Sequence, residues 1–152
     1  MQGYLVRPKS VRTVYVAGGD IATITRVIEF LRDLGLRPVS GKRNQAGVSA
    51  DWRALAELCN HNLQALFKCD LCLALLDGNP TDVADVCVEM GLAYANDIPV
   101  LGLCTFPELR TSPMVVGMCR GDDQMAYSIE GLRDLVSEHI ELTDAALEAN
   151  NG

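Results

Sequence analysis

The sequence has no cluster of five or more basic residues, and its 13 lysines and arginines are outnumbered by 20 aspartates and glutamates. The formal net charge is −7. A phosphate backbone repels such a chain, so this composition argues against nucleic acid as the main partner. Binding of a small anionic ligand is still compatible with this charge, because backbone N–H groups at the start of a helix bind an anion without a lysine.

Long apolar runs are also absent. No apolar stretch approaches the roughly 18 residues that a membrane span requires. The first residues, MQGYLVRPKSVRTVYVAGG, lack the apolar core of a signal peptide. We therefore expect a cytoplasmic protein with no membrane partner.

The sequence lacks a second pair of metal ligands beside its one CxxC motif. Its six cysteines lie mostly within apolar segments, where a reduced thiol packs as a small hydrophobic side chain. Cys69 and Cys72 have the CxxC spacing, but Cys72 opens an apolar, strand-like run instead of a helix. The pattern therefore predicts no metal centre and no redox function.

What the sequence does contain is an alternation of short apolar runs with longer amphipathic stretches. Five segments have the composition of strands: 13–19, 36–41, 70–78, 98–105 and 124–128. Four segments have apolar residues at helical spacing: 21–35, 51–68, 82–96 and 129–149. The polar segment 42–50 is expected to be a loop, and 106–123 a loop with a short helix.

Alternating strands and helices predict a single three-layer α/β domain over residues 1–152, Rossmann-like (flavodoxin-like), with a five-stranded, mainly parallel sheet. Residues 143–152 are expected to be a frayed C-terminal tail. Ligands bind such sheets outside the carboxyl ends of the strands, where the strand order reverses. This rule makes Gly18 and Asp77 candidate substrate-binding residues, and it places the site at four segments: 17–20, 40–45, 76–82 and 104–112.

One carboxylate stands out in an otherwise apolar helix. Glu89 lies within DVCVEMGLAYAND (85–97) and shares a helical stripe with Asp82 and Asp85. A solvated helix face is the ordinary explanation, but Asp85 and Glu89 repel each other, and the helix begins beside the predicted site. A glutamate within two turns of a helix start is kept ionised by the helix dipole. Since an ionised carboxylate can attack an electrophilic sugar carbon, Glu89 is a candidate nucleophile.

Three segments resemble the nucleoside 2-deoxyribosyltransferases: VYVAGG, CDLCLALLDG and DVCVEMGLAYANDIPVL. The match spans roughly residues 13–118. The resemblance implies that Glu89 attacks C1′ and holds the deoxyribosyl group covalently, and that the Tyr15 hydroxyl steadies this carboxylate. It also implies that Asp82 or Asp85 binds the sugar hydroxyls, although the spacing does not decide between them.

Two positions depart from the family pattern. Asn62 stands where the family has an aspartate that protonates or hydrogen-bonds the leaving base, and an amide cannot deliver a proton as an acid. His61 or a bound water are alternatives for that proton. Ser112 replaces the asparagine of the family's Asn-x-Met loop, in which Met114 fits. A serine there resembles the related branch that hydrolyses nucleoside 5′-monophosphates.

The loop and the first turn carry further implications. In the family, the loop that resembles Ser112–Met114 reaches into a neighbouring subunit's site, so the resemblance implies a homo-oligomer, a dimer or higher, with shared active sites. Asp20 in the turn GGDIAT would repel phosphate, which favours an unphosphorylated nucleoside as the partner.

The resemblance implies a nucleoside 2-deoxyribosyltransferase of nucleotide salvage, a pentosyltransferase that exchanges the base of a 2′-deoxynucleoside through a covalent deoxyribosyl-glutamate intermediate. It implies no metal or organic cofactor. Two alternatives are open at this point. An N-glycosidase would use Glu89 in the same way, with water accepting the sugar from a nucleoside or a nucleoside 5′-monophosphate. A non-catalytic nucleotide-binding domain on the same fold is favoured by Asn62.

Overall fold

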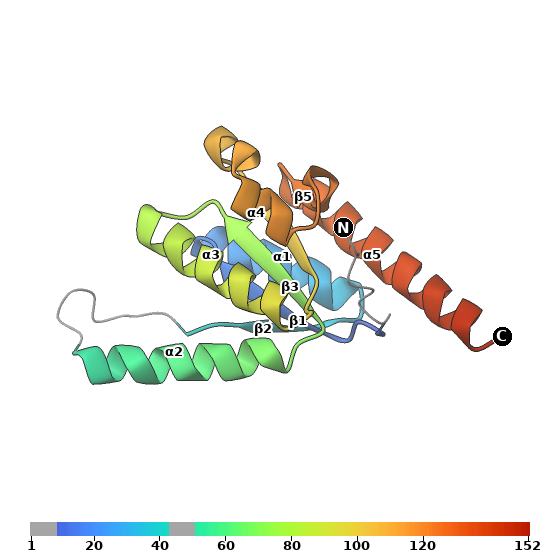
Figure 1. The fold of residues 1–152 in the computed structure, drawn as a ribbon, viewed down its shortest axis with the longest axis horizontal. Helices are drawn as coiled ribbons and strands as arrows, with labels where there is room; N and C mark the ends of the chain where they lie inside the picture. The colour runs from blue at the N-terminus through green and yellow to red at the C-terminus, as the bar shows by residue number, and fades with distance from the viewer. Residues whose placement is uncertain (1–8, 43–50) are drawn as a thin grey trace.

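The computed structural model describes residues 9–42 and 51–152, and its core is a five-stranded parallel sheet with the order β2-β1-β3-β4-β5 (Figure 1). The strands are β1 (Thr13–Gly18), β2 (Arg37–Ser40), β3 (Leu71–Leu76), β4 (Val100–Cys104) and β5 (Met125–Ala126). This order reverses between β1 and β3, as in flavodoxin-like folds. The predicted α/β fold with a five-stranded parallel sheet is confirmed.

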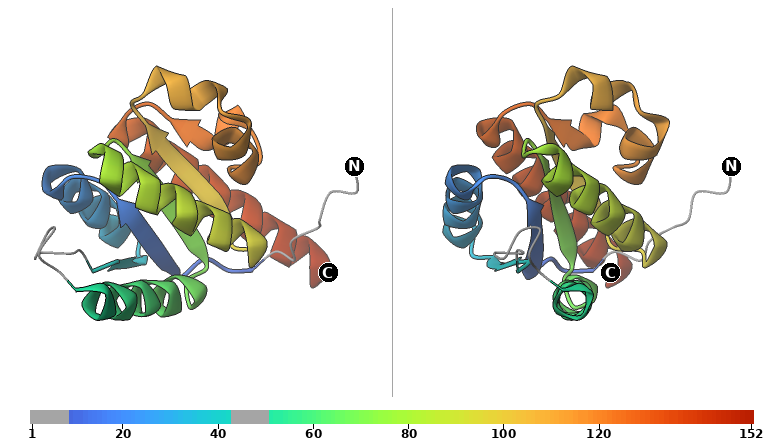
Figure 2. Two further views of the ribbon diagram at one scale, coloured as in Figure 1. Left: turned by 60° about the vertical axis from the view of Figure 1, so that its left-hand side comes forward. Right: turned by 90° about the vertical axis from the view of Figure 1, so that its left-hand side faces the viewer.

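Helices cover both faces of the sheet (Figure 2). One face packs against α1 (Ile21–Asp33) and α5 (Ile129–Asn150). The other face packs against α2 (Trp52–Phe67), α3 (Pro80–Ala95) and the short α4 (Pro113–Met118). Two 3-10 turns, η2 (Pro107–Thr111) and η3 (Asp122–Gln124), flank α4.

The alternation of side chains along β1 decides which residues face the α2–α3 layer. Val14 and Val16 point into the core under α1 and α5, whereas Tyr15 and Ala17 point into the core under α2 and α3. All six residues of β3 are buried because helices cover the sheet on both sides. Tyr15 is therefore a core residue whose ring lies beneath the helices that follow β2 and β3.

Side-chain caps set the helix starts. Asp51 caps α2 by accepting from the N–H of Ala54, as predicted. Asn79 caps α3, and Pro80 takes the first helical position. Proline is favourable there because the backbone N–H at this position has no partner within the helix. The helix therefore begins at Pro80, two residues before the predicted start at Asp82.

Two further expectations concern the chain ends and loops. The terminal helix α5 continues to Asn150, so residues 143–150 are helical and the predicted frayed tail is wrong. Most of the predicted loop 42–50 lies outside the described residues. The segment 106–123 contains η2 and α4, which agrees with the expected loop and short helix.

The helix α2 is the least buried element of its layer. Leu66, near its C-terminal end, is its one buried residue. Its first half is exposed, including Trp52 and Leu55. Among the helices of the described residues, none is long and apolar enough to cross a membrane.

Candidate active site

A pocket of about 1010 Å³ lies between α2 and α3, over β1 and the end of β2. It sits beside the point where the strand order reverses, as the rule for such sheets predicts. Six of the nine candidate site residues line it: Tyr15, Gly18, Asn62, Asp82, Asp85 and Glu89. The other three, Asp77, Ser112 and Met114, are not among the residues that line this pocket.

A hydrogen bond between β1 and α3 lies at the edge of the pocket. The Tyr15 hydroxyl donates to Oε1 of Glu89 over 3.1 Å. The Tyr15 side chain is fully buried, and Glu89 is partly buried. The pairing that the family resemblance implied for these two residues is therefore present in the geometry.

Burial dominates the electrostatics of this pair. It raises the pKa of Glu89 to about 7; the negative charge of Asp85 adds to the rise, and the hydrogen bond from Tyr15 opposes it. Burial and the neighbouring Glu89 carboxylate raise the pKa of Tyr15 well above its ordinary value of 10.0. Tyr15 therefore stays a protonated donor, while Glu89 exchanges its proton near neutral pH.

This result corrects the expected effect of the helix dipole on Glu89. Because α3 begins at Pro80, Glu89 lies in the third turn, beyond the first turn where the dipole acts strongly. Desolvation outweighs any remaining dipole field, and the carboxyl is harder to ionise than an exposed glutamate.

Two aspartates of α3 stand between Glu89 and the helix start. Asp82 is held by Asn79, whose side-chain amide donates to Oδ2 of Asp82 over 3.0 Å. Asp85 is exposed and acts on Glu89 through its charge. Both line the pocket, so the geometry leaves either one available to the hydroxyls of a ligand.

Gly18 and Asp77 have structural partners at the ends of their strands. Gly18 has φ +72°, and a side chain there would collide with Val86, so the glycine lets α3 approach β1. Asp77 accepts from the Thr23 hydroxyl over 2.9 Å, which ties α1 to the end of β3. Its other oxygen is buried and has no hydrogen-bond partner among the described residues.

Asn62 lines the pocket, but its amide is already hydrogen-bonded to the backbone of Lys42. Its Oδ1 accepts from the Lys42 N–H over 2.7 Å, and its Nδ2 donates to the Lys42 carbonyl over 2.9 Å. One lone pair and one N–H of the amide remain for the expected contact with a base edge. His61, the alternative proton donor, is exposed and does not line the pocket.

Ser112 and Met114 lie on the α4 side of the sheet. The Ser112 hydroxyl accepts from the Val115 N–H over 3.4 Å and caps α4. The Met114 side chain is 66% exposed. Neither residue reaches the pocket of its own chain.

Sequence reasoning missed two parts of the pocket. The first is the strand end Gly41–Lys42. It lies within the predicted site segment 40–45, but neither residue was predicted individually. The second is an apolar wall made by side chains of α2 and α3: Leu55, Leu58, Leu63, Val88 and Leu92. Their helical spacing predicts that they share one face of each helix, but it does not predict that this face lines a pocket.

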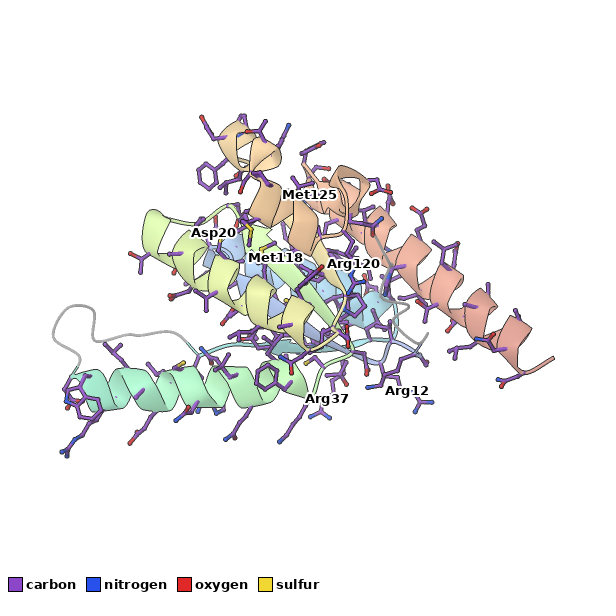
Figure 3. The ribbon with its side chains drawn as sticks, viewed as in Figure 1. Arg12, Asp20, Arg37, Met118, Arg120 and Met125 are labelled. Carbon is purple, nitrogen blue, oxygen red and sulfur yellow. The ribbon has the colours of Figure 1, made fainter. Side chains whose placement is uncertain are left out.

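Among the described residues that line the pocket, negative charges predominate. Asp82, Asp85 and Glu89 line it, and Lys42 is the one cationic side chain among the described residues that line it. Asp20, which caps α1, lies at the same end of the sheet, whereas Arg12 and Arg37 lie at the opposite end (Figure 3). A phosphate group would therefore meet more repulsion than attraction from these described side chains.

The cysteines are all free, and burial raises the pKa of the Cys69 thiol to about 11 and that of Cys72 well above its ordinary value. Both thiols therefore stay protonated and unreactive at neutral pH. In the described part of the chain, no group of three or more His, Cys, Asp or Glu side chains is placed to hold a metal ion.

Comparison with known proteins points to one family. The family model described as nucleoside 2-deoxyribosyltransferase matches residues 14–136. A 2-deoxyribosyltransferase from the psychrotolerant bacterium Bacillus psychrosaccharolyticus is 17% identical, with a TM-score of 0.61 over 80% of this chain and 90% of that one. The solution structure of BlsM is 18% identical, with a TM-score of 0.65 over 91% of this chain and 95% of that one. No curated protein matches the sequence significantly.

We expect Tyr15→Phe to raise the pKa of Glu89 further above about 7, by roughly one unit, because it removes the hydrogen bond that stabilises the carboxylate. A pH titration of the Glu89 side-chain carboxyl carbon by NMR measures this shift. Tyr94→Phe, on the exposed part of α3, is the matched control. An unchanged or lowered pKa in Tyr15→Phe would contradict the pairing.

Proposed function

The chain belongs to the nucleoside 2-deoxyribosyltransferase family, and from that premise we propose that it exchanges the base of a 2′-deoxynucleoside, with Glu89 as the nucleophile. The observation that carries this proposal is the Tyr15–Glu89 hydrogen bond at the edge of the pocket between α2 and α3. It supports a carboxylate that is held in one orientation and faces a space large enough for a nucleoside.

In the proposed reaction, the Glu89 carboxylate attacks C1′ of the sugar, and the C1′–N bond breaks with its electron pair going to the departing base. The sugar is then held as an ester of Glu89. A nitrogen of a second base attacks C1′ and gives up its proton, which balances the proton that the departing base takes up, and the carboxylate is released. The Tyr15 hydroxyl keeps donating to the carboxylate, so it fixes which oxygen faces C1′.

The charge distribution supports an unphosphorylated nucleoside as the substrate. Three carboxylates and one lysine line the described part of the pocket. Carboxylates accept hydrogen bonds from sugar hydroxyls, whereas they repel a 5′-phosphate. Asp82 and Asp85 are the proposed partners of those hydroxyls.

We expect the protein to convert deoxyinosine and free adenine into deoxyadenosine, and Glu89→Gln to lower this turnover at least about 10³-fold, because an amide is a very weak nucleophile. Chromatography of the products measures both. Glu57→Gln, an exposed change on α2, is the control for expression and fold. If free base is released at the same rate without adenine, the protein is a hydrolase and not a transferase. Full activity in Glu89→Gln would exclude the mechanism.

The pKa of Glu89 predicts how activity and stability depend on pH. Attack requires the ionised carboxylate, so kcat/KM should rise through pH of about 7 and level off above it. The folded protein retains the Glu89 proton between pH 4.5 and about 7, where the unfolded chain has lost it, so this group's contribution to stability falls as pH rises through that range.

At pH 8, Glu89→Gln should therefore stabilise the fold by roughly 1–3 kcal/mol, since no buried charge has to form. Thermal or denaturant unfolding at pH 5 and pH 8 measures the difference. A stabilisation of the same size at both pH values would contradict the raised pKa.

We also propose that the protein is a homo-oligomer in which the Ser112–Met114 segment completes the pocket of a neighbouring subunit. The segment does not reach its own pocket, and Met114 exposes a large apolar side chain, which supports a contact outside the chain. A symmetric assembly would place this segment at each site in turn.

Mixing two poorly active variants tests for shared sites. Glu89→Gln lacks the nucleophile, and Met114→Ala lacks the loop side chain, so mixed oligomers should contain some complete sites and regain part of the activity. Light scattering reports the oligomeric state of each sample. A monomeric wild-type protein, or mixed oligomers without regained activity, would contradict the proposal.

A further inference from the structure

Asn62 makes a two-point contact that is unusual for a pocket side chain. Its amide oxygen accepts from the N–H of Lys42, and its amide nitrogen donates to the carbonyl of the same residue. The two hydrogen bonds, 2.7 and 2.9 Å long, join the middle of α2 to the strand end that follows β2. Each polar atom of the amide therefore has one of its two hydrogen-bonding positions taken by the Lys42 backbone.

The residue before Lys42 lies directly against the reacting pair. A Cβ on Gly41 would lie 2.5 Å from the Tyr15 hydroxyl oxygen and 3.2 Å from Oδ1 of Asn62. Only a glycine therefore allows this backbone to lie over the hydroxyl. Because Asn62 fixes Lys42, it also fixes how closely Gly41 covers Tyr15.

We propose that Asn62 is a positioning residue, which holds the Gly41–Lys42 backbone over the Tyr15 hydroxyl and thereby keeps water away from one side of the Tyr15–Glu89 pair. This proposal rests on the function proposed above for that pair. It gives the amide a role that no carboxylate could fill equally well, because only an amide can both accept from the Lys42 N–H and donate to its carbonyl.

The consequence is electrostatic. Burial is the largest cause of the raised pKa of Glu89, so a backbone that excludes water contributes to it. The titratable and charged groups around Glu89 are Tyr15 from β1, Cys72 from β3, Cys59 from α2, Asp85 and Asp82 from α3, and Lys42 from the strand end. Asn62 carries no charge, and its removal leaves these groups in place except for Lys42, whose ammonium would raise the Glu89 pKa on moving away. A fall in the Glu89 pKa therefore reports the access of water.

The test compares three variants by NMR titration of the Glu89 carboxyl carbon, assigned with Glu89→Gln. In Asn62→Ala, Gly41–Lys42 is released, water enters, and the pKa of Glu89 falls from about 7 toward its ordinary value by roughly one unit. In Gly41→Ala, the new methyl pushes the same backbone away from Tyr15 and lowers the pKa in the same direction. Asn60→Ala, on the exposed side of α2, leaves it unchanged.

The pH dependence of kcat/KM shifts to lower pH by the same amount in Asn62→Ala and Gly41→Ala. An unchanged Glu89 pKa in a folded Asn62→Ala overturns the proposal. If Asn62→Ala does not fold, an unchanged pKa in Gly41→Ala overturns it instead. A higher KM for the acceptor base, with an unmoved pH profile, would assign Asn62 to base binding and likewise overturn it.

The NMR titration separates this inference from the proposed function, because it needs no turnover. A protein without transferase activity in which Asn62→Ala lowers the Glu89 pKa keeps the positioning role and loses the function. An active transferase in which the pKa does not move keeps the function and loses the positioning role.

Discussion

The hydrogen bond between Tyr15 and Glu89 is the constraint on which the rest of the site depends. It joins the first strand to the third helix over 3.1 Å, across 74 residues of sequence. Two glycines make room for it: Gly18 lets α3 approach the end of β1, and Gly41 lets the end of β2 lie over the phenol. The parallel sheet brings these segments together, because the carboxyl ends of β1, β2 and β3 meet at one edge.

Burial gives this pair its chemical character. Desolvation raises the pKa values of both groups, so at neutral pH the phenol is a donor and the carboxyl is close to the point of losing its proton. A carboxylate that is costly to form is also a more reactive one, since fewer water molecules stabilise its charge. The surrounding aspartates add further negative charge beside the Glu89 carboxylate. Arg12 and Arg37 lie at the other end of the sheet and do not neutralise it.

The sequence predicted the elements better than the site. Apolar periodicity and capping residues located all five strands and the main helices, because burial on a two-sided sheet leaves a strong pattern. It misplaced the start of α3, since the Asn79–Pro80 cap was not recognised, and this error made the helix dipole on Glu89 seem strong. The partners of Asn62 and the exposure of Met114 were beyond reach, because backbone contacts across 20 residues and the direction of a loop leave no periodic signal.

The low burial of α2 has a consequence for how ligands enter and leave the pocket. Leu66 near its C-terminal end is its one buried residue, and Asn62 holds its middle to the Lys42 backbone, so the half before Asn62, which forms a wall of the pocket, is the least anchored part. Tilting that half exposes little new apolar surface and therefore costs little free energy. In the proposed exchange, this tilt would let a first base leave and a second base enter, while the sugar stays bonded to Glu89 of α3.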